Sequence, residues 1–306
     1  MKTSLDHLPS DKQDRIRRAV EVIVATSSIG KTKDRVAMIV LFGSYARGNF
    51  VDDLRGSDDG KFSYHSDFDL LVVMSEGIPR KTSAMIGLRH AIERELGFHD
   101  VNNLLRREGR VRLILHEIAD LNWQLELGHY FFHDILDEGV LLYDTEQFTL
   151  KPRGVIDLAG RTKAARKDFD QWFDEGQGFL LAAEAMSDHG RLTNAAFQLH
   201  QAAERFFNVV ELVFCSYKSK THSIIDLIQI TGSLHTDFFM VFPRETTRDR
   251  RILELMHRAY VTARYWPKEY EITASDLAQM MQCVRRLEQL AEQRCEERIA
   301  SMQAEG

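Results

Sequence analysis

The sequence is poor in cysteine and contains no long apolar run, and both absences exclude classes of protein. Its three cysteines, Cys215, Cys283 and Cys295, are an odd number without the close spacing of a zinc site. We therefore predict no disulfide framework and a reduced, cytoplasmic environment. The first residues are charged rather than apolar, and no run approaches the length that spans a bilayer, so we expect neither secretion nor a membrane partner.

Positive charge is also in short supply. The 40 lysines and arginines are outnumbered by 46 acidic residues, which gives a net charge of -6. This balance does not support a basic nucleic-acid surface over the whole chain, although a local patch that binds nucleic acid stays open. With 306 residues, 44% of them hydrophobic, the chain is long enough for two globular domains.

The pattern of apolar residues changes near residue 150. Before it, short apolar runs predict strands at 36–42, 68–73, 111–118 and 139–144, with helices around 11–25, 79–96, 121–127 and 130–136. After it, helical periodicity predicts helices at 156–187, 191–217, 221–231, 246–265 and 273–300. The sequence thus predicts an α+β protein, with a mixed sheet and helices in domain 1–150 and an all-α antiparallel bundle in domain 151–306.

Two short motifs accompany the first two predicted strands. Strand 36–42 ends at Gly43 and Ser44, where a glycine turn into a helix would bring N–H groups and a hydroxyl to a phosphate, with Arg47 one turn further. Asp67 and Asp69 are two residues apart, so their carboxylates would project from one strand face. A divalent cation shared with a triphosphate would stabilise two such carboxylates, which indicates magnesium-dependent phosphoryl chemistry.

The order of these residues also carries a family resemblance. Gly43, Ser44, Ala46, Arg47 and Gly48, followed after a gap by Asp67 and Asp69, resemble the signature of the minimal nucleotidyltransferases of the DNA polymerase β superfamily. The resemblance implies a nucleotidyltransferase fold, ATP or another nucleoside triphosphate as substrate, and two magnesium ions on the aspartates. It also implies transfer of a nucleoside monophosphate, with release of pyrophosphate, to a hydroxyl of a small molecule, a protein or an RNA.

The chain departs from that signature in two places. Residues 49–66 are a longer gap than a minimal member needs, and their turn signals and alternating aromatic residues predict a hairpin that overhangs the site. The family also takes a third carboxylate from a later strand, as general base or metal ligand. Glu117 is the only acid in strand 111–118 and is our candidate, whereas Arg112 stands nearer the strand's start, where many relatives place an aspartate.

The second half resembles the HEPN family of helical domains. The residues that carry this likeness are 199–206 in the second helix of the bundle, 220–227 after it, and 259–267 later. The resemblance implies a homodimer that pairs through these helices. Its layout, with a transferase domain before a bundle, is similar to kanamycin nucleotidyltransferase and to toxin–antitoxin pairs that combine the two domains.

Some HEPN proteins cleave RNA with an arginine and a histidine a few residues apart, and this chain offers two such pairs. His257 lies seven residues after Arg250 and six after Arg251. On a regular helix Arg250, His257 and Arg264 form one stripe, opposite the apolar face, which is either a solvated surface or a functional one. An alternative function is therefore an RNA-cleaving or RNA-binding protein, with a toxin–antitoxin or defence role, whose first domain only senses nucleotide.

Overall fold

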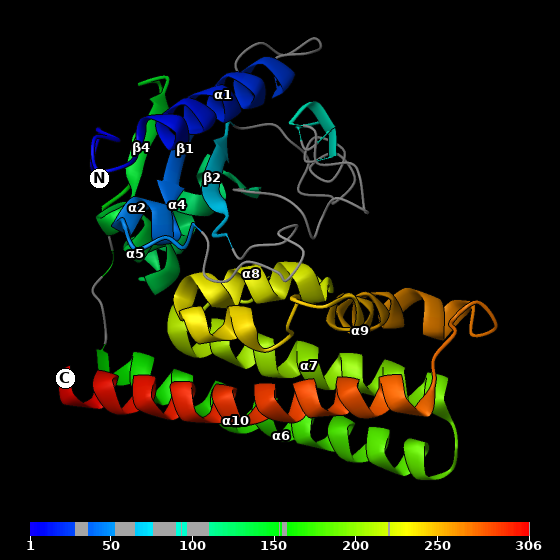
Figure 1. Cartoon of the computed structure of the whole chain (residues 1–306). Coiled ribbons are helices and arrows are strands. Elements are labelled where there is room, and N and C mark those ends of the chain that lie inside the picture. The colour runs from blue at the N-terminus through cyan, green and yellow to red at the C-terminus, as the bar shows by residue number, and fades with distance from the viewer. Residues whose placement is uncertain are drawn as a thin grey trace. The chain divides into compact units, whose positions relative to one another are not determined.

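The computed structural model describes residues 1–27, 36–52, 65–75, 90–92, 94–96, 110–152, 154, 158–219 and 221–305 (Figure 1). By their mutual contacts, the described residues up to 154 form one compact unit, and those from 158 onward form another. The first unit contains a four-stranded mixed sheet, and the described part of the second contains helices without strands. The α+β class predicted from the sequence is confirmed.

The N-terminal unit is built around a sheet in the order β3-β2-β1-β4. Its elements are α1 (Ser10–Ser27), β1 (Val36–Phe42), α2 (Gly43–Arg47), β2 (Phe68–Met74), β3 (Val111–Glu117), α4 (Ile118–Glu126), α5 (Tyr130–Glu138) and β4 (Val140–Asp144). Strand β1 runs antiparallel to β2 and β4, whereas β2 and β3 are parallel. The hairpin predicted within 49–66 and most of the helix predicted at 79–96 lie outside the described residues.

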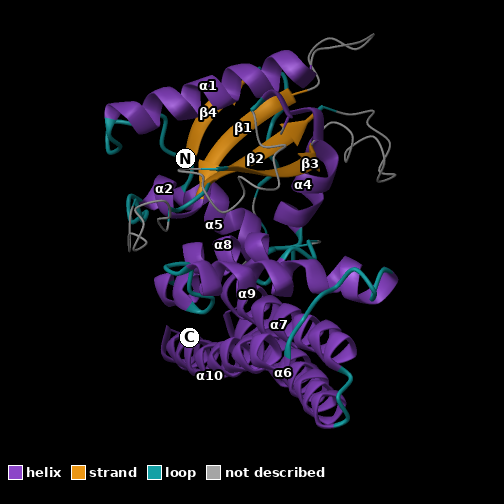
Figure 2. Ribbon diagram, turned by 45° about the vertical axis from the view of Figure 1, so that its right-hand side comes forward, coloured by secondary structure: helices purple, strands orange, loops and turns teal. Residues whose placement is uncertain are grey.

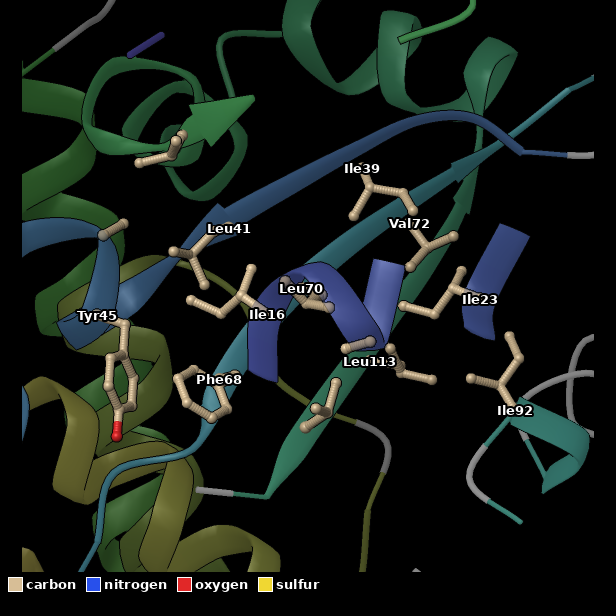
Figure 3. Packing of buried hydrophobic residues seen from close by; sticks show 14 of the residues in the cluster. Ile16, Ile23, Ile39, Leu41, Tyr45, Phe68, Leu70, Val72, Ile92 and Leu113 are labelled. Atoms are coloured by element: carbon tan, nitrogen blue, oxygen red, sulfur yellow. The ribbon is translucent and has the colours of Figure 1, made fainter. Parts of the chain in front are cut away.

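Both faces of the sheet are covered, which explains why every residue of β1 and β2 is buried. On one face, Ile16 and Ile23 of α1 pack against alternate strand residues such as Ile39 and Val72 (Figure 3). Figure 2 shows α1 lying along this face. On the other face, residues of α4 and α5 pack against the intervening positions, including Val40 and Leu71. The alternation of strand side chains thus places one core on each side of the sheet.

The C-terminal unit is a bundle whose three longest helices lie side by side (Figure 1). They are α6 (Leu158–Asp188), α7 (Leu192–Cys215) and α10 (Ala274–Glu305). Between α7 and α10 come α8 (Ile224–Leu234), the 3-10 helix η2 (Thr236–Met240), α9 (Thr247–Arg258) and the π-helical turn η3 (Ala259–Ala263). Among the described residues, no helix is long and apolar enough to cross a membrane. Among the described residues, none of the three cysteines forms a disulfide.

The bundle differs from the sequence prediction at two helices. The helix predicted at 221–231 begins at Ile224, because the Ser223 hydroxyl accepts from the backbone N–H of Asp226 and caps it there. The helix predicted at 246–265 starts as expected, with a capping box between Thr246 and Asp249. It then loosens into the π-helical turn η3, which apolar periodicity does not reveal.

Candidate functional site

The turn between β1 and α2 brings Gly43 against Asp69. Phe42 is the antiparallel partner of Asp69, so the residue that follows it lies directly beside the aspartate carboxylate. Gly43 has φ +73°, and a Cβ built on it would clash with Asp69 Oδ2. A side chain here would meet both the left-handed backbone and the carboxylate, so glycine is required on two independent grounds.

Two oxygens at this turn are buried without a hydrogen-bond partner among the described residues. They are the Ser44 hydroxyl and Oδ2 of Asp69, on side chains that are 3% and 1% exposed. An unpaired buried oxygen costs about 1–3 kcal/mol, so native proteins rarely leave one without a hydrogen bond. The two oxygens therefore mark a place where a ligand would supply the missing interactions.

Asp67 lies just before β2 on the same strand path, and its position is fixed by the chain around it. Ser66 exchanges hydrogen bonds with Val51, its N–H donating to the Val51 carbonyl at 2.8 Å and its hydroxyl accepting from the Val51 N–H at 2.9 Å. Asp67 is 5% exposed. Asp67 precedes β2, which begins at Phe68; if the strand alternation extends back by this one residue, the carboxylates of Asp67 and Asp69 face the same side.

Arg112 is the immediate partner of Asp69. The two residues are opposite each other in the parallel register of β2 and β3, and Arg112 Nε donates to Asp69 Oδ1 at 2.5 Å. The guanidinium also lies 5.8 Å from the centre of the Phe42 ring. Burial raises the pKa of Asp69 above its ordinary value, and the positive charges of Arg112 and Arg47 oppose that rise.

The remaining predicted residues of this site are placed elsewhere. Glu117 is level with Met74 in the β2–β3 register, five residues beyond the level of Asp69. At about 3.3 Å per strand residue, that separation is about 16 Å, so the structure does not bring Glu117 to the aspartates. Arg47 pairs with Glu138 at 3.2 Å, although it remains near enough to act on the charge of Asp69.

The carboxylates do not form a closed metal cage. Within the described part of the chain, no three His, Cys, Asp or Glu side chains converge to hold a metal ion. Magnesium does not need such a cage, because it commonly takes one or two carboxylates and completes its octahedron with phosphate oxygens and water. Oδ2 of Asp69, which has no hydrogen-bond partner among the described residues, fits that kind of donor set, and Asp67 is the nearest acid to it along the chain.

The stripe predicted from Arg250, His257 and Arg264 does not persist as a single helical face. Arg250 Nη1 donates to the carbonyls of Arg244 and Glu245, at 3.1 and 3.0 Å, and so helps to secure the start of α9. The π-helical turn η3 lies between His257 and Arg264 and breaks the seven-residue repeat on which the stripe depends. Arg264 instead lies over the rings of Phe197 and Tyr265.

A second polar cluster, centred on His222, lies in the C-terminal unit. His222 Nδ1 is 3.0 Å from Oε2 of Glu204, a carboxylate with a side chain only 5% exposed, whereas the imidazole is 50% exposed. Tyr260, carried by the π-helical turn η3, stacks on the His222 ring with centroids 4.6 Å apart. The carboxylate thus orients an imidazole whose outer edge reaches solvent, an arrangement that suits acid–base chemistry.

His200 contacts this cluster through the backbone of His222. Its Nε2 lies 3.1 Å from the backbone carbonyl of His222, and its Nδ1 lies 3.3 Å from the side-chain amide of Gln201. Burial lowers the pKa of His200 to about 3, with smaller contributions from the charges of His257 and His222. His200 is therefore a neutral imidazole, donating at Nε2 and accepting at Nδ1.

Sequence reasoning missed Glu204 as the partner of His222 and Arg112 as the partner of Asp69. The acid lies in α7, 18 residues before the histidine, and contact between them depends on how the segment after α7 folds back. In the sequence, Arg112 stands out only as a departure from a family pattern. Its place in the strand could have indicated the contact: Asp69 and Arg112 are the second residues of β2 and β3, and two parallel strands that begin side by side also pair their second residues.

Comparison with known families gives one match. Residues 169–294, which extend from α6 into α10, match the HEPN domain family. This finding confirms the resemblance of the helical bundle, and the match does not extend to the N-terminal unit, whose mixed sheet with helices is consistent with the predicted nucleotidyltransferase fold. No curated protein matches the chain.

Proposed function

We propose that the N-terminal unit is a magnesium-dependent nucleotidyltransferase. The observation that carries this proposal is at the turn where Gly43 packs against Asp69: the hydroxyl of the next residue, Ser44, and one oxygen of Asp69 are buried without a partner among the described residues. A metal–triphosphate would supply a cation for the carboxylates to coordinate and phosphate oxygens to accept a hydrogen bond from the hydroxyl. The sequence motif, the burial and the missing hydrogen bonds thus favour the same ligand.

Each residue would have a distinct role. Asp67 and Asp69 would hold magnesium, which neutralises charge on the triphosphate as the acceptor oxygen bonds to the α-phosphorus and pyrophosphate leaves. Ser44 would donate its hydroxyl to a phosphate oxygen, and Gly43 would keep the turn close to it. Because Glu117 lies five strand positions beyond the level of Asp69, we expect the proton of the acceptor hydroxyl to pass to Asp67, to Asp69 or to solvent.

The partners follow from this reaction class. The donor would be ATP or another nucleoside triphosphate, and the acceptor a hydroxyl of a small molecule, a protein or an RNA. A homodimer formed through the helical unit and a cytoplasmic location complete the proposal.

The direct test is transfer of label from α-labelled ATP with magnesium, measured as pyrophosphate release and as labelled acceptor. We expect Asp67→Asn to reduce the rate at least about 100-fold, since it removes a carboxylate that neutralises charge in the transition state. Glu117→Gln is the matched control, because it removes an acid from the same sheet at a distance from Asp69. Pyrophosphate release that survives in Asp67→Asn would contradict the proposal.

The HEPN match favours a second candidate function, in which the helical unit cleaves or binds RNA, with a toxin–antitoxin or defence role. The specific observation is the His222 imidazole fixed on Glu204 and stacked on Tyr260. An imidazole held in this way could take a proton from a ribose hydroxyl or give one to a leaving oxygen. Arg250, in contrast, is committed to backbone carbonyls.

Three variants distinguish the two functions. If the helical unit cleaves RNA, degradation of a labelled RNA should be lost in His222→Ala and in His257→Ala and retained in Asp67→Asn. Cleavage that persists in both histidine variants would eliminate this cluster as the nuclease site. Loss of nucleotide transfer alone in Asp67→Asn, with no RNA cleavage by the unsubstituted protein, would leave the transferase as the function.

A further inference from the structure

We propose that Arg112 is a built-in cation of the Asp67–Asp69 site and that it restricts the site to one divalent ion. The inference rests on the proposed nucleotidyltransferase function and deepens it. Its basis is the position of Arg112 directly opposite Asp69 in the parallel β2–β3 register. At this level of the neighbouring strand the chain supplies a positive charge to the carboxylates, not a third negative one.

The contact uses one of the two oxygens of Asp69. Arg112 Nε donates to Oδ1 at 2.5 Å, and Oδ2 is buried without a hydrogen-bond partner among the described residues. A single divalent ion would use Oδ2 together with Asp67. A second ion at Oδ1 would have to share that oxygen with the guanidinium against the repulsion of its positive charge, or displace it.

Displacement of Arg112 would be costly. The arginine side chain is 13% exposed and that of Asp69 is 1% exposed, so water offers the guanidinium little compensation within the sheet. An arginine keeps its charge at every physiological pH, and so it cannot leave the site by losing a proton. The Phe42 ring, 5.8 Å from the guanidinium carbon, packs on the same group and limits where it can move.

Charge counting supports the same conclusion. Asp67 and Asp69 carry two negative charges, and Arg112 returns one positive charge at hydrogen-bond distance from Asp69. The remaining charge suits one divalent cation that arrives with a triphosphate better than two cations that arrive separately. Arg112 would therefore act as a positioning residue, holding Asp69 in one orientation and taking the place of a second metal ion.

The test is a count of manganese ions per bound nucleotide. Manganese, as a substitute for magnesium, and a non-hydrolysable α,β-methylene ATP analogue are equilibrated with the full chain by dialysis, and both are measured in the protein compartment. We expect one manganese per nucleotide in the unsubstituted protein and two in Arg112→Asp. Arg112→Lys should keep the ratio at one.

A second measurement uses manganese alone, followed by the paramagnetic resonance of the free ion. Arg112→Gln should bind manganese about 10–100-fold more tightly than the unsubstituted protein, because it removes a positive charge in contact with Asp69 that repels the ion. Arg47→Gln is the matched control, because Arg47 also acts on the charge of Asp69 but pairs with Glu138 rather than with the aspartate. Its effect should be smaller.

The outcomes distinguish this inference from the function on which it rests. Two manganese ions per nucleotide in the unsubstituted protein would overturn the role of Arg112, and this result needs no variant to fold. The role of Arg112 would also be overturned if the unsubstituted protein and Arg112→Asp both bound one ion and Arg112→Gln bound manganese with unchanged affinity. The transferase site would then stand, and Arg112 would be only the ion-pair partner of Asp69. Retention of neither manganese nor nucleotide by any of these proteins would refute both proposals.

Discussion

Each unit of this protein contains a buried carboxylate with a basic partner, and the two partners differ in kind. Asp69 lies within a sheet and faces Arg112, a permanent cation with a side chain only 13% exposed. Glu204 lies on a helix of the bundle and faces His222, an imidazole that is 50% exposed and able to change its charge. The first pair is closed to solvent, whereas the second has one side open to it.

The chemistry of the basic partner determines what each carboxylate can do. A permanent internal cation compensates a charge without exchanging protons, so the Asp69 pair is suited to holding a geometry in which another cation can bind. A half-exposed imidazole oriented by a carboxylate is suited to moving a proton.

The largest effect on stability is expected from removing one member of the closed pair. Asp69→Leu should lower the free energy of unfolding by about 3–5 kcal/mol, because it leaves a nearly buried guanidinium without its counter-ion. The measurement is urea denaturation followed by circular dichroism.

The matched control restores the balance by removing the arginine as well. The double variant Asp69→Leu with Arg112→Met should recover most of the lost stability, since an apolar pair of similar volume replaces a buried ion pair at little cost. If the double variant were no more stable than Asp69→Leu, the loss would come from the altered packing of the sheet and not from the unpaired charge.

The next effect concerns the turn that faces Asp69. Gly43→Ala should cost about 2–5 kcal/mol, as the sum of left-handed backbone strain and overpacking against the carboxylate. Gly48→Ala is the matched control, because Gly48 has a similar φ of +83° but, among the described residues, its new Cβ would meet only His7, at 3.6 Å. It should cost about 1–2 kcal/mol, the backbone strain alone. Equal losses in denaturation experiments would mean that the Asp69 carboxylate can move away.

The sequence was sufficient to predict most of the first unit's sheet. Strands β1 and β2 are fully buried and read as apolar runs, and the positions of Gly43 after β1 and Asp67 before β2 follow directly from where those runs end and begin. Glu117 was predicted as a third carboxylate because it is the only acid in its strand. The pattern along one strand does not determine which of its residues lies beside Asp69. That depends on the register between β2 and β3, which places Arg112 beside Asp69.

The second unit was predictable as a bundle for a different reason. Long stretches of helical periodicity fixed α6, α7 and α10 to within a few residues, except that α10 continues to Glu305. The π-helical turn η3 could not be foreseen, because its apolar residues Ala259 and Ala263 are four apart and fit a regular α-helix equally well. The contact between Glu204 and His222 depends on the fold of the segment after α7, which no local pattern specifies.

Acid should destabilise the bundle through its buried histidine. The folded pKa of His200 is about 3, below the value of about 6.5 expected in the unfolded chain. The unfolded chain therefore takes up a proton as the pH falls below about 6.5, and the native chain does not, so stability is lost between these two values. Lowering the pH from 7.5 to 5 should cost about 2 kcal/mol through this group, or 1.5 units at about 1.36 kcal/mol each.

Urea denaturation at both pH values would measure this loss, with His200→Gln as the matched variant. Glutamine keeps an N–H donor for the His222 carbonyl but cannot take up a proton in this range, so the variant should lose about 2 kcal/mol less than the unsubstituted protein on acidification. If both proteins lost the same stability on acidification, the loss would come from groups other than His200. His222 and His257 are the histidines whose charges act on His200.

The smallest effect is expected at the open pair. His222→Phe keeps a ring for stacking on Tyr260 but removes the group that bonds Glu204, and we expect a loss of about 1 kcal/mol. The loss should stay well below that of Asp69→Leu, because water can reach the exposed side of this pair and Arg205 lies 3.7 Å from Glu204. His222→Asn, which restores a donor, should recover part of the loss in denaturation experiments. A loss as large as that of Asp69→Leu would show that Glu204 depends on His222 alone, and the distinction between a closed and an open pair would fail.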